Sequence, residues 1–293
     1  MKSLRFNILV ALLVSAICLA GSAMAAEIKF GVQASRGAVK ALKKWTEMAK
    51  YLEKETGYKI KLVPLNPSVT VKAAKEGKVD MMLSNPVLAV VLQKKMGFTP
   101  VATLKKKSGP RFGGVIISKK GSGIKTAKDL KGKKVMAYKF KKSAAAYVFQ
   151  VKHLKDKGID PHKDFKSFKE AKKQDDIVLA VHKGLIDAGF VKTGMVEAMA
   201  KEGKIKLDEI NIVDQVKDDY QHKHTTALYP HWTLGYKPGY DMAIVAKVKA
   251  ALLKLKADHV AAKKAKIKGF VEAVSLDGLS ETLKALKLPP YDS

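Results

Sequence analysis

The stretch EIKFGVQASRGAVKALKKWTEMAKYLEKETGYKIKLVP, residues 27–64, determines the fold class that the sequence predicts. It begins with one apolar run, Glu27–Val32, and ends with another, Tyr58–Val63, and each has the length of a strand. Residues 37–55 predict one amphipathic helix, because apolar side chains recur about every 3.6 residues. Those positions are Ala38, Ala41, Leu42, Trp45, Met48, Ala49 and Leu52. A strand, a helix and a strand in this order are typical of an α/β fold with parallel strands.

The same alternation continues along the chain, and it predicts mostly parallel sheets with helices on both faces. Further strands are predicted over residues 78–83, 100–104, 113–118, 133–138, 165–168, 185–191 and 209–213. Further helices are predicted over residues 68–76, 86–96, 126–130, 143–157, 175–183, 194–202, 242–255, 258–266 and 279–286.

The length and the order of the elements predict two lobes. A chain of 293 residues suits two domains of about 100–200 residues each. A polar stretch, residues 214–226, separates the middle elements from the last helices, so we expect the second α/β unit to be inserted into the first. Lobe 1 is then formed by residues 26–116 plus 220–293, and lobe 2 by residues 117–219. We expect the segment 279–286 to pack back on lobe 1.

Residues 1–25 have the pattern of a cleaved secretory signal peptide. Lys2 and Arg5 precede an apolar stretch from Phe6 to Ala20, and Ala23-Met24-Ala25 supplies a small-x-small cleavage pattern. The only cysteine of the chain, Cys18, lies inside this segment. The mature chain would therefore contain no disulfide and no thiolate chemistry, and we expect it in the periplasm.

The charge of the chain is high and is carried almost entirely by lysine. The sequence has 53 Lys and three Arg against 27 acidic residues, which gives a net charge of +29. Nucleic-acid-binding proteins favour Arg, whose planar fork pairs with phosphates and guanine edges, so we do not expect a nucleic-acid partner. The lysines are spread along nearly every predicted element. They are expected mainly to solvate the surface, and a positive field of this kind also steers anions to a site.

Motifs for catalysis and for metal binding are missing from the sequence. It contains no GxSxG, GxGxxG or P-loop pattern, and Asp175 and Asp176 are neighbours on one predicted helix rather than an opposed acid–base pair. His222, His224 and His231 lack acidic or Cys companions at ligand spacing, so we interpret them as solvated loop groups. We therefore expect no enzymatic activity, no metal and no cofactor.

Several predicted strands run directly into helices through small polar residues, and this indicates an anion site. Ligands of parallel α/β sheets bind at the carboxyl ends of strands, where helix N-termini offer unpaired N–H groups. The same residue types also cap helices everywhere, so each junction alone can be only a cap. The junctions are Ser35-Arg36-Gly37, Ser84-Asn85-Pro86, Lys142-Ser143-Ala144, Gln174-Asp175 and Lys192-Thr193-Gly194.

The two arginines outside the signal segment lie in loops. Arg36 follows the first strand, and Arg111 precedes Gly113-Gly114 near the predicted crossing into lobe 2. In a chain that otherwise uses Lys, these positions suit bidentate contact with an oxyanion, although chance placement explains them equally well. The ligand-binding residues that the sequence predicts are Ser35, Arg36, Ser84, Asn85, Arg111, Lys139, Ser143, Asp175, Lys192 and Thr193.

Four segments of the chain carry a family resemblance. They are KWTEMAKYLEKETGYKIKLVP (residues 44–64), AAKEGKVDMMLSNP (73–86), GSGIKTAKDLKGKKVMAY (121–138) and DDIVLAVHKGLIDAGFVKTGMVEAMAKEGKI (175–205). Together they resemble the phosphonate/phosphite-type family of periplasmic substrate-binding proteins. Residues 192–205, followed by ALYPHW (227–232), look most like the branch found as sensory domains of histidine kinases that respond to oxyanions. The resemblance implies a type II fold whose two lobes close on a ligand by hinge bending.

The resemblance also assigns roles to single residues. Ser84 and Asn85 fall in a polar strand-end loop that faces the cleft, and Ser143 falls in a Ser/Thr-rich turn that here is KFKKSAAA, beginning at Lys139. Gln174 stands where phosphonate binders commonly have His, and Thr193 stands where they have an acidic residue for the ligand's amino group. These departures disfavour an aminoalkylphosphonate and favour a compact anion without an amine.

The sequence therefore predicts a monomeric periplasmic binding protein for a small phosphate-like or sulfur oxyanion. Its partners would be the permease subunits of an ABC transporter or a membrane histidine kinase. The alternative is an exported polycation that adheres to acidic membrane or protein surfaces, because lysine dominates the charge on all faces.

Overall fold

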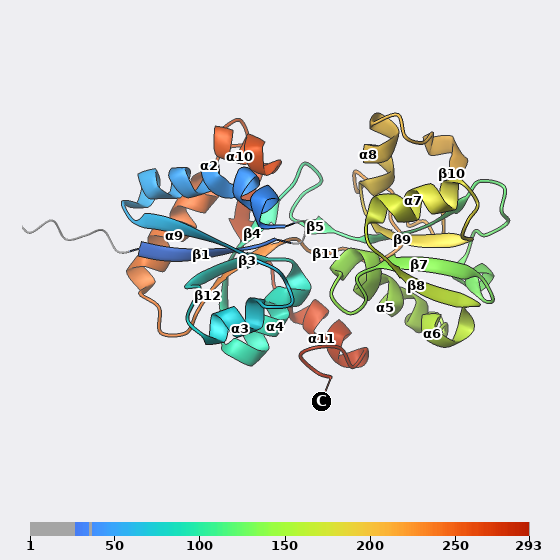
Figure 1. The fold of residues 1–293 in the computed structure, drawn as a ribbon, viewed down its shortest axis with the longest axis horizontal. Helices are drawn as coiled ribbons and strands as arrows, with labels where there is room; N and C mark the ends of the chain where they lie inside the picture. Colours follow the sequence, from blue (N-terminus) through green and yellow to red (C-terminus); the bar gives the residue numbers. More distant parts are fainter. Residues whose placement is uncertain (1–26, 35–36, 293) are drawn as a thin grey trace, which may run out of the picture.

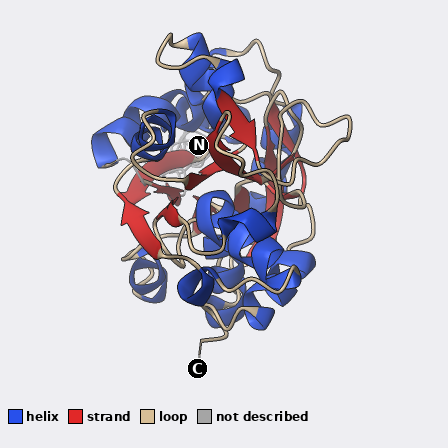
Figure 2. Ribbon diagram, turned by 90° about the vertical axis from the view of Figure 1, so that its right-hand side faces the viewer, coloured by secondary structure: helices blue, strands red, loops and turns tan. Residues whose placement is uncertain are grey.

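The computed structural model describes residues 27–34 and 37–292, which form two large sheets with helices on both faces (Figure 1). The predicted signal segment and the predicted site residues Ser35 and Arg36 lie outside the described residues. In the first sheet the strand order is β13-β4-β12-β3-β1-β2, and in the second it is β10-β6-β9-β7-β8. Viewed from the side of the second sheet, helices lie on both sides of the strands (Figure 2). Across the described part of the chain, no helix is both long enough and apolar enough to cross a bilayer.

The strands of the first sheet are β1 (Glu27–Gln33), β2 (Lys59–Leu65), β3 (Met81–Ser84), β4 (Thr99–Lys105), β12 (Thr233–Tyr236) and β13 (Gly269–Glu272). Its helices are α2 (Ala38–Thr56), α3 (Thr70–Lys75), α4 (Pro86–Met96), α9 (Met242–Lys254) and α10 (Val260–Ala265). The second sheet has β6 (Gly114–Lys119), β7 (Lys134–Tyr138), β8 (Ser167–Ala171), β9 (Ala188–Lys192) and β10 (Ile210–Ile212). Around it lie the α-helices α5 (Phe149–Asp156), α6 (Pro161–Asp164), α7 (Gln174–His182) and α8 (Met195–Lys201), the 3₁₀ turns η1 (Ala127–Leu130) and η3 (Leu207–Glu209), and the π-helical turn η2 (Ala144–Val148).

The first βαβ unit forms as the sequence predicts. β1 pairs with β2 in parallel, with Phe30 opposite Leu62. α2 buries its apolar stripe on this pair, and the side chain of Trp45 is only 1 % exposed. Burial of one such large side chain contributes about 1.5–3 kcal/mol, so the stripe stabilises the unit strongly. Gly57 ends the helix in a left-handed conformation, and its N–H donates to the Glu53 carbonyl at 2.9 Å.

The expectation of mostly parallel sheets is wrong. β12 lies antiparallel between β3 and β4, and β13 pairs antiparallel with β4. In the second sheet β6 is antiparallel to both β9 and β10. The reason is that the chain crosses between the sheets: the returning segment inserts β12 into a sheet that is already formed by earlier strands, and it enters from the opposite end.

The helix predicted over residues 143–157 is divided into η2 and α5. Ala146 has non-helical dihedral angles, and the Gln150 side chain donates to the carbonyls of Ala145 and Val191. Gly114 is needed beside this turn, because a Cβ atom there would lie 2.5 Å from the Cγ atom of Gln150. The wide turn therefore lets a polar side chain join the helix to the neighbouring strand.

A short ribbon and the last helix connect the two sheets. β5 (Arg111–Phe112) pairs antiparallel with β11 (Tyr229–Pro230) between them (Figure 1). The sequence predicted that the last segment packs on lobe 1 alone. Helix α11 (Asp277–Ala285) instead packs against elements of both sheets. Its Leu279 and Leu283 share one apolar cluster with α4 and with η2 and α5 of the other sheet. The Tyr229 ring stacks on Phe149 with centroids 4.0 Å apart, so aromatic packing reinforces this connection.

We predict that Leu283→Ala destabilises the whole protein. Leu283 is fully buried between helices of both sheets, and removal of such a side chain leaves a cavity that costs about 2–5 kcal/mol. Urea unfolding followed by circular dichroism measures the loss. Lys284→Ala, an exposed neighbour on the same helix, is the control and should change stability by less than about 0.5 kcal/mol. Equal stability of the two variants would contradict the role of α11 in joining the sheets.

Candidate functional site

A cleft of about 530 Å³ lies between elements of the first sheet and the carboxyl end of β9. Its lysines come from α2, from the segment after β4, from β9 and from the region of α10. Among the described residues that line it, none is Asp or Glu. The charged and aromatic lining side chains are Lys44, Lys106, Lys107, Lys192, Lys263, Lys266, Lys268, Phe112, Tyr220, His222, His231 and Trp232.

Lys44 lies at the edge of the buried face of α2, next to Trp45. Its Nζ atom lies 4.7 Å from the ring centroid of Trp45 and 5.6 Å from that of Trp232, so the two rings hold the ammonium group by cation–π contact. Burial and the positive charges of Lys192 and Lys266 lower the pKa of Lys44 to about 8. The low pKa means that the positive charge of Lys44 is costly at this position.

Lys106 follows β4 and is fixed by the end of α10. Its Nζ atom donates to the backbone carbonyl of Lys266, the residue at which α10 ends in a left-handed conformation. Burial lowers the pKa of Lys106 to about 7, with further lowering by Lys44, Lys192 and Lys266. Both lysines therefore lose part of their charge near neutral pH unless an anion compensates for it.

His231 forms a neutral hydrogen-bond donor in the cleft. Its Nδ1 accepts from the Trp232 N–H at 2.8 Å, and its ring stacks on Phe112 with centroids 4.7 Å apart. Burial, followed by the charges of Lys106, Lys192 and Lys44, holds the pKa of His231 well below its usual value. Because Nδ1 accepts, the neutral ring carries its proton on Nε2.

The second sheet contributes Lys192 and Thr193 at the end of β9. Thr193 is buried, and it exchanges two hydrogen bonds with Gly113: its N–H donates to the Gly113 carbonyl at 3.0 Å, and its Oγ1 accepts at 3.4 Å. The backbone N–H of Lys192 donates to Oε1 of Gln174 at 2.9 Å. The end of β9 is thus fixed directly beside the β5–β6 connection.

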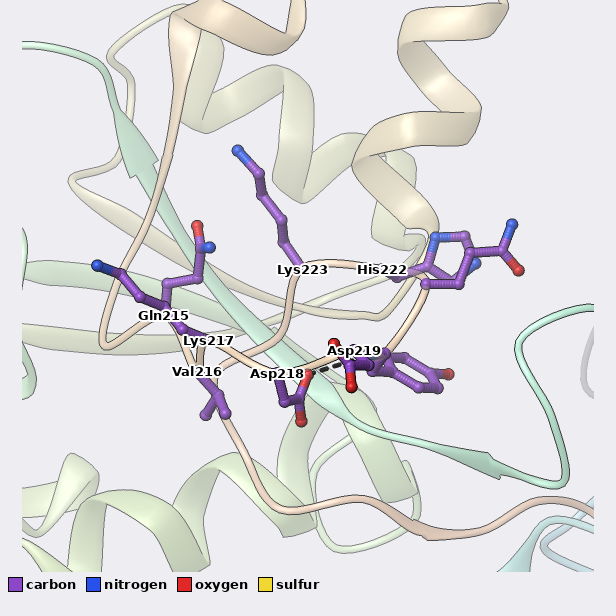
Figure 3. A pocket seen from close by; sticks show the side chains of 9 residues that line it. Gln215, Val216, Lys217, Asp218, Asp219, His222 and Lys223 are labelled. Carbon is purple, nitrogen blue, oxygen red and sulfur yellow. Dashed lines mark hydrogen bonds between the residues drawn. The ribbon is translucent and has the colours of Figure 1, made fainter.

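The loop 215–223, whose side chains Figure 3 shows, contributes Tyr220 and His222 to the lining of the cleft. The Tyr220 hydroxyl donates to the Arg111 carbonyl at 3.0 Å, and Nδ1 of His222 lies 3.4 Å from Oε1 of Glu197. The loop also forms a hollow of about 440 Å³ of its own. That hollow is lined by residues of this one segment, Asp218 and Asp219 among them, so it is a weaker anion site than the cleft.

The comparison with known families identifies the chain. Residues 30–277 match the family described as "ABC transporter, phosphonate, periplasmic substrate-binding protein". The chain belongs to this family. The match confirms the resemblance that the sequence carries, and it confirms a function in binding rather than catalysis, because the members of this binding-protein family capture substrates for transport. It also indicates an extracytoplasmic location.

Individual relatives agree with this assignment. The tetrathionate sensor histidine kinase TtrS of Salmonella typhimurium is 27 % identical over 228 residues, which cover 76 % of this chain and 38 % of the kinase. The arginine-binding extracellular protein ArtP of Bacillus subtilis is 27 % identical over 155 residues, which cover 53 % of this chain and 54 % of that protein. The chain therefore matches about two fifths and about half of the lengths of these two relatives.

Solved structures of similar fold confirm the type II periplasmic binding protein architecture with a cleft between lobes. PhnD1 from Prochlorococcus marinus, in complex with methylphosphonate, has a TM-score of 0.69 at 16 % identity, over 89 % of this chain and 98 % of that one. XAC2383 from Xanthomonas citri, bound to ATP, has a TM-score of 0.73 at 17 % identity, over 90 % and 98 %.

Two of the ten predicted site residues, Lys192 and Thr193, line the cleft of this binding protein. Two more, Ser35 and Arg36, lie outside the described residues. Arg111 is exposed on the connecting ribbon, where its guanidinium donates to the Leu228 carbonyl at 3.4 Å.

The other five have structural contacts of their own. The Asn85 side chain caps α4 by accepting from the Leu88 N–H, and Ser143 occupies the N-cap position of η2. Ser84 is fully buried, and its hydroxyl makes no hydrogen bond with the described residues. Lys139 pairs with Glu170 at 3.3 Å, and Asp175 lies 3.6 Å from Lys204.

The interpretation of the three histidines as solvated loop groups is wrong for two of them. His224 is 2 % exposed, with Nε2 3.0 Å from Oδ2 of Asp218 and Nδ1 2.7 Å from the Thr226 carbonyl. His231 is half-buried, lines the cleft and stacks on Phe112. Within the described residues no group of three or more His, Cys, Asp or Glu side chains could hold a metal ion.

Sequence reasoning missed Lys44, Lys106, His231 and Trp232 as cleft residues. Lys44 is one of five lysines on its helix, and Lys106 is one of three in a row, so nothing in the sequence distinguishes them. The segment ALYPHW carried the resemblance to the sensory branch, but it assigned no cleft role to His231 or Trp232.

We predict that the stability of the ligand-free protein increases from pH 7 to pH 9.5. Lys44 and Lys106 have pKa values of about 8 and about 7 in the fold against an ordinary value of 10.5, so over this interval the unfolded chain binds more protons. Stability therefore rises with pH, and anion affinity should fall, since bound anion favours the protonated lysines. Thermal melts across the interval measure the rise.

The double variant Lys44→Gln/Lys106→Gln should lose most of this pH dependence. Lys43→Gln, an exposed neighbour on α2, should keep it. A slope that is unchanged in the double variant would assign the effect to groups outside the cleft. The other titratable groups that line the cleft are Lys107, Lys192, Lys263, Lys266, Lys268, Tyr220, His222 and His231, with Glu197 beside His222.

Proposed function

We propose that this protein captures a small oxyanion without an amino group in the cleft beside β9. The observation that carries the proposal is a cleft with seven lysines and, among its described lining residues, no carboxylate. Some lysines outside the cleft lie beside a carboxylate: Lys237 lies 2.6 Å from Asp80, and Lys254 lies 2.9 Å from Glu55. A cluster of cations without carboxylates is favourable only when an anion occupies it.

The neutral donors of the cleft suit an oxyanion. Nε2 of His231 offers a hydrogen bond without adding charge, and the compact ammonium groups of Lys44 and Lys106 provide charge-assisted hydrogen bonds. The names of some similar proteins support an anionic ligand: one is a sensor of tetrathionate, and two solved structures hold methylphosphonate or ATP.

The chemistry of the cleft disfavours cationic and amine-bearing ligands. An arginine or an aminoalkylphosphonate carries a positive group that needs an acidic partner, and Thr193 stands where the resemblance places one. We therefore propose that neither an amino acid nor an aminoalkylphosphonate is the ligand, although one relative is an arginine-binding protein.

We propose further that the protein works as an exported monomer. Its residues 1–25 would be removed on export, lobe 1 would comprise residues 26–116 plus 220–293, and lobe 2 residues 117–219. The first and second sheets largely fit this division, since β1 to β4, β12 and β13 fall in the first range and β7 to β10 in the second, while β6 crosses the boundary between them. The closed form would be recognised by the permease of an ABC transporter or by a membrane histidine kinase.

Titration calorimetry with a panel of anions tests the proposal. Phosphate, phosphite, methylphosphonate, sulfate, thiosulfate and tetrathionate should include one clear ligand, and 2-aminoethylphosphonate and arginine should not bind. Lys44→Gln should lower the affinity for that ligand by about tenfold or more, because a charged hydrogen bond is worth about 1.5–3 kcal/mol. Lys43→Gln serves as the matched control on the same helix and should bind as the unaltered protein does.

Two outcomes would reject the proposal. If the folded protein binds no anion of the panel, the proposal that it captures an oxyanion is wrong. Binding that falls steeply with salt and ignores the identity of the anion would instead favour the alternative, a polycation that adheres to acidic surfaces.

A further inference from the structure

His224 follows the loop 215–223, and each nitrogen of its ring faces a hydrogen-bond acceptor. Nδ1 lies 2.7 Å from the carbonyl oxygen of Thr226, and Nε2 lies 3.1 Å and 3.0 Å from the two carboxylate oxygens of Asp218. Hydrogen bonds from His224 and from the Tyr220 N–H hold the pKa of Asp218 below its usual value, so this carboxylate is ionised at neutral pH. A carbonyl oxygen and an ionised carboxylate only accept, so both ring nitrogens must donate. Two donating nitrogens are the property of the charged imidazolium.

A neutral His224 ring does not fit these surroundings. It carries one proton, so its other nitrogen would turn a lone pair toward an oxygen that also accepts. The residue is only 2 % exposed, which leaves water little access to relieve that contact. The other titratable side chains of the loop are Lys217, Asp219, Tyr220, His222 and Lys223, and Oε1 of Glu197 lies 3.4 Å from Nδ1 of His222. Asp218 supplies the opposite charge that a buried imidazolium needs.

The ring of His224 connects the loop to the second sheet. Thr226 exchanges two hydrogen bonds with Gly114 of β6: its Oγ1 accepts from the Gly114 N–H at 2.9 Å, and its N–H donates to the Gly114 carbonyl at 3.3 Å. The Nδ1 contact holds His224 on this fixed segment, and the His224 carbonyl accepts from the Val216 N–H at 2.9 Å. On the other side of the ring lies Asp218, an exposed residue of the loop. The ring therefore bridges a fixed segment and an exposed one.

Asp218 extends this fixed position to the cleft. Its Oδ1 also accepts from the Tyr220 N–H at 3.1 Å. The Tyr220 ring packs edge to face against His224, with centroids 5.4 Å apart, and against His222 with centroids 6.0 Å apart. Tyr220 and His222 are the side chains that this loop contributes to the lining of the cleft, and Figure 3 shows Asp218 and His222 on the same segment. The positions of both side chains thus depend on the contact between Asp218 and His224.

We propose that His224 is a buried imidazolium that acts through Asp218 as the positioning residue for Tyr220 and His222 in the cleft. The inference rests on the proposed function, because it takes this cleft as the ligand site. Loss of the Asp218 charge leaves the imidazolium unpaired at a buried position, and loss of one His224 proton turns a lone pair toward an acceptor. Either change removes the contact that ties the loop to Thr226. Tyr220 and His222 then leave their places in the lining, and the affinity for the anion falls.

Nitrogen-15 NMR of the histidine side chains tests the charge state in the full chain without ligand. At pH 7 both ring nitrogens of His224 should give the signals of an imidazolium, assigned by their loss in His224→Gln. If that variant does not fold, the shift of the same signals in Asp218→Asn assigns them, since Asp218 is exposed. His231, whose Nδ1 accepts a hydrogen bond, is the internal reference and should give the signals of a neutral ring. A His224 ring that is neutral at pH 7 would overturn the proposal.

A spin label at Gln221→Cys, an exposed position of the loop, tests the positioning role in the full chain carrying Cys18→Ser. Without ligand, Asp218→Asn should increase the mobility of the label. Asp219→Asn, the exposed neighbour, is the matched control and should leave it unchanged. Asp218→Glu keeps the charge and should restore part of the order that Asp218→Asn loses.

Calorimetry with methylphosphonate and sulfate as probes measures the consequence for binding in the same variants without the label. Asp218→Asn should lower the affinity by about three- to tenfold, which corresponds to the loss of one neutral hydrogen bond, and Asp219→Asn should not. Equal label mobility or equal affinity in these two variants would overturn the positioning role. If neither probe binds the unaltered protein, the proposed function loses support from these probes, whereas the NMR signals and the label still decide whether the charged pair holds the loop in place.

Discussion

Apolar contact between the two sheets on one side of the molecule is the constraint on which the cleft depends. Tyr229 stacks on Phe149, and Leu283 of α11 fills the space between α4 and α5. In Figure 1 helix α11 lies below the β5–β11 ribbon, while α10, whose Lys263 lines the cleft, lies above it. Because these apolar contacts hold the two sheets together, they fix the relative positions of the elements that line the cleft.

The lysines of the chain fall into two groups with different physical roles. Most are exposed, and several form ion pairs such as Lys152 with Asp156, which contribute little to stability in water. Seven line the cleft, where no described lining residue is acidic, and two of these, Lys44 and Lys106, are partly desolvated. The net charge of +29 therefore shifts the pKa of a lysine only where the fold removes water and brings lysines from several elements together.

Local patterns predicted most elements well but only part of the site. Helix α4 begins at Pro86 and ends at Met96 as predicted, because Asn85 caps it and Gly97 ends it in a left-handed conformation. The four-residue strands β12 and β13 were missed, because pairing within the sheet, rather than local pattern, makes them strands. Lys192 and Thr193 could be predicted because ligands gather at strand ends. Lys44 and Lys106 could not, because their surroundings are created by α10 and β12, which are distant in sequence.

The use of lysine rather than arginine in the cleft has a physical reason of its own. A guanidinium stays charged at every physiological pH, so a cluster of arginines would keep its full repulsion whenever the site is empty. The ammonium groups of Lys44 and Lys106, with pKa values of about 8 and about 7, release protons in the empty cleft and regain them when an anion arrives. Binding of the proposed anion would then be coupled to uptake of protons by these two lysines. A lysine cleft can therefore hold anions of high charge tightly without making the empty protein correspondingly unstable.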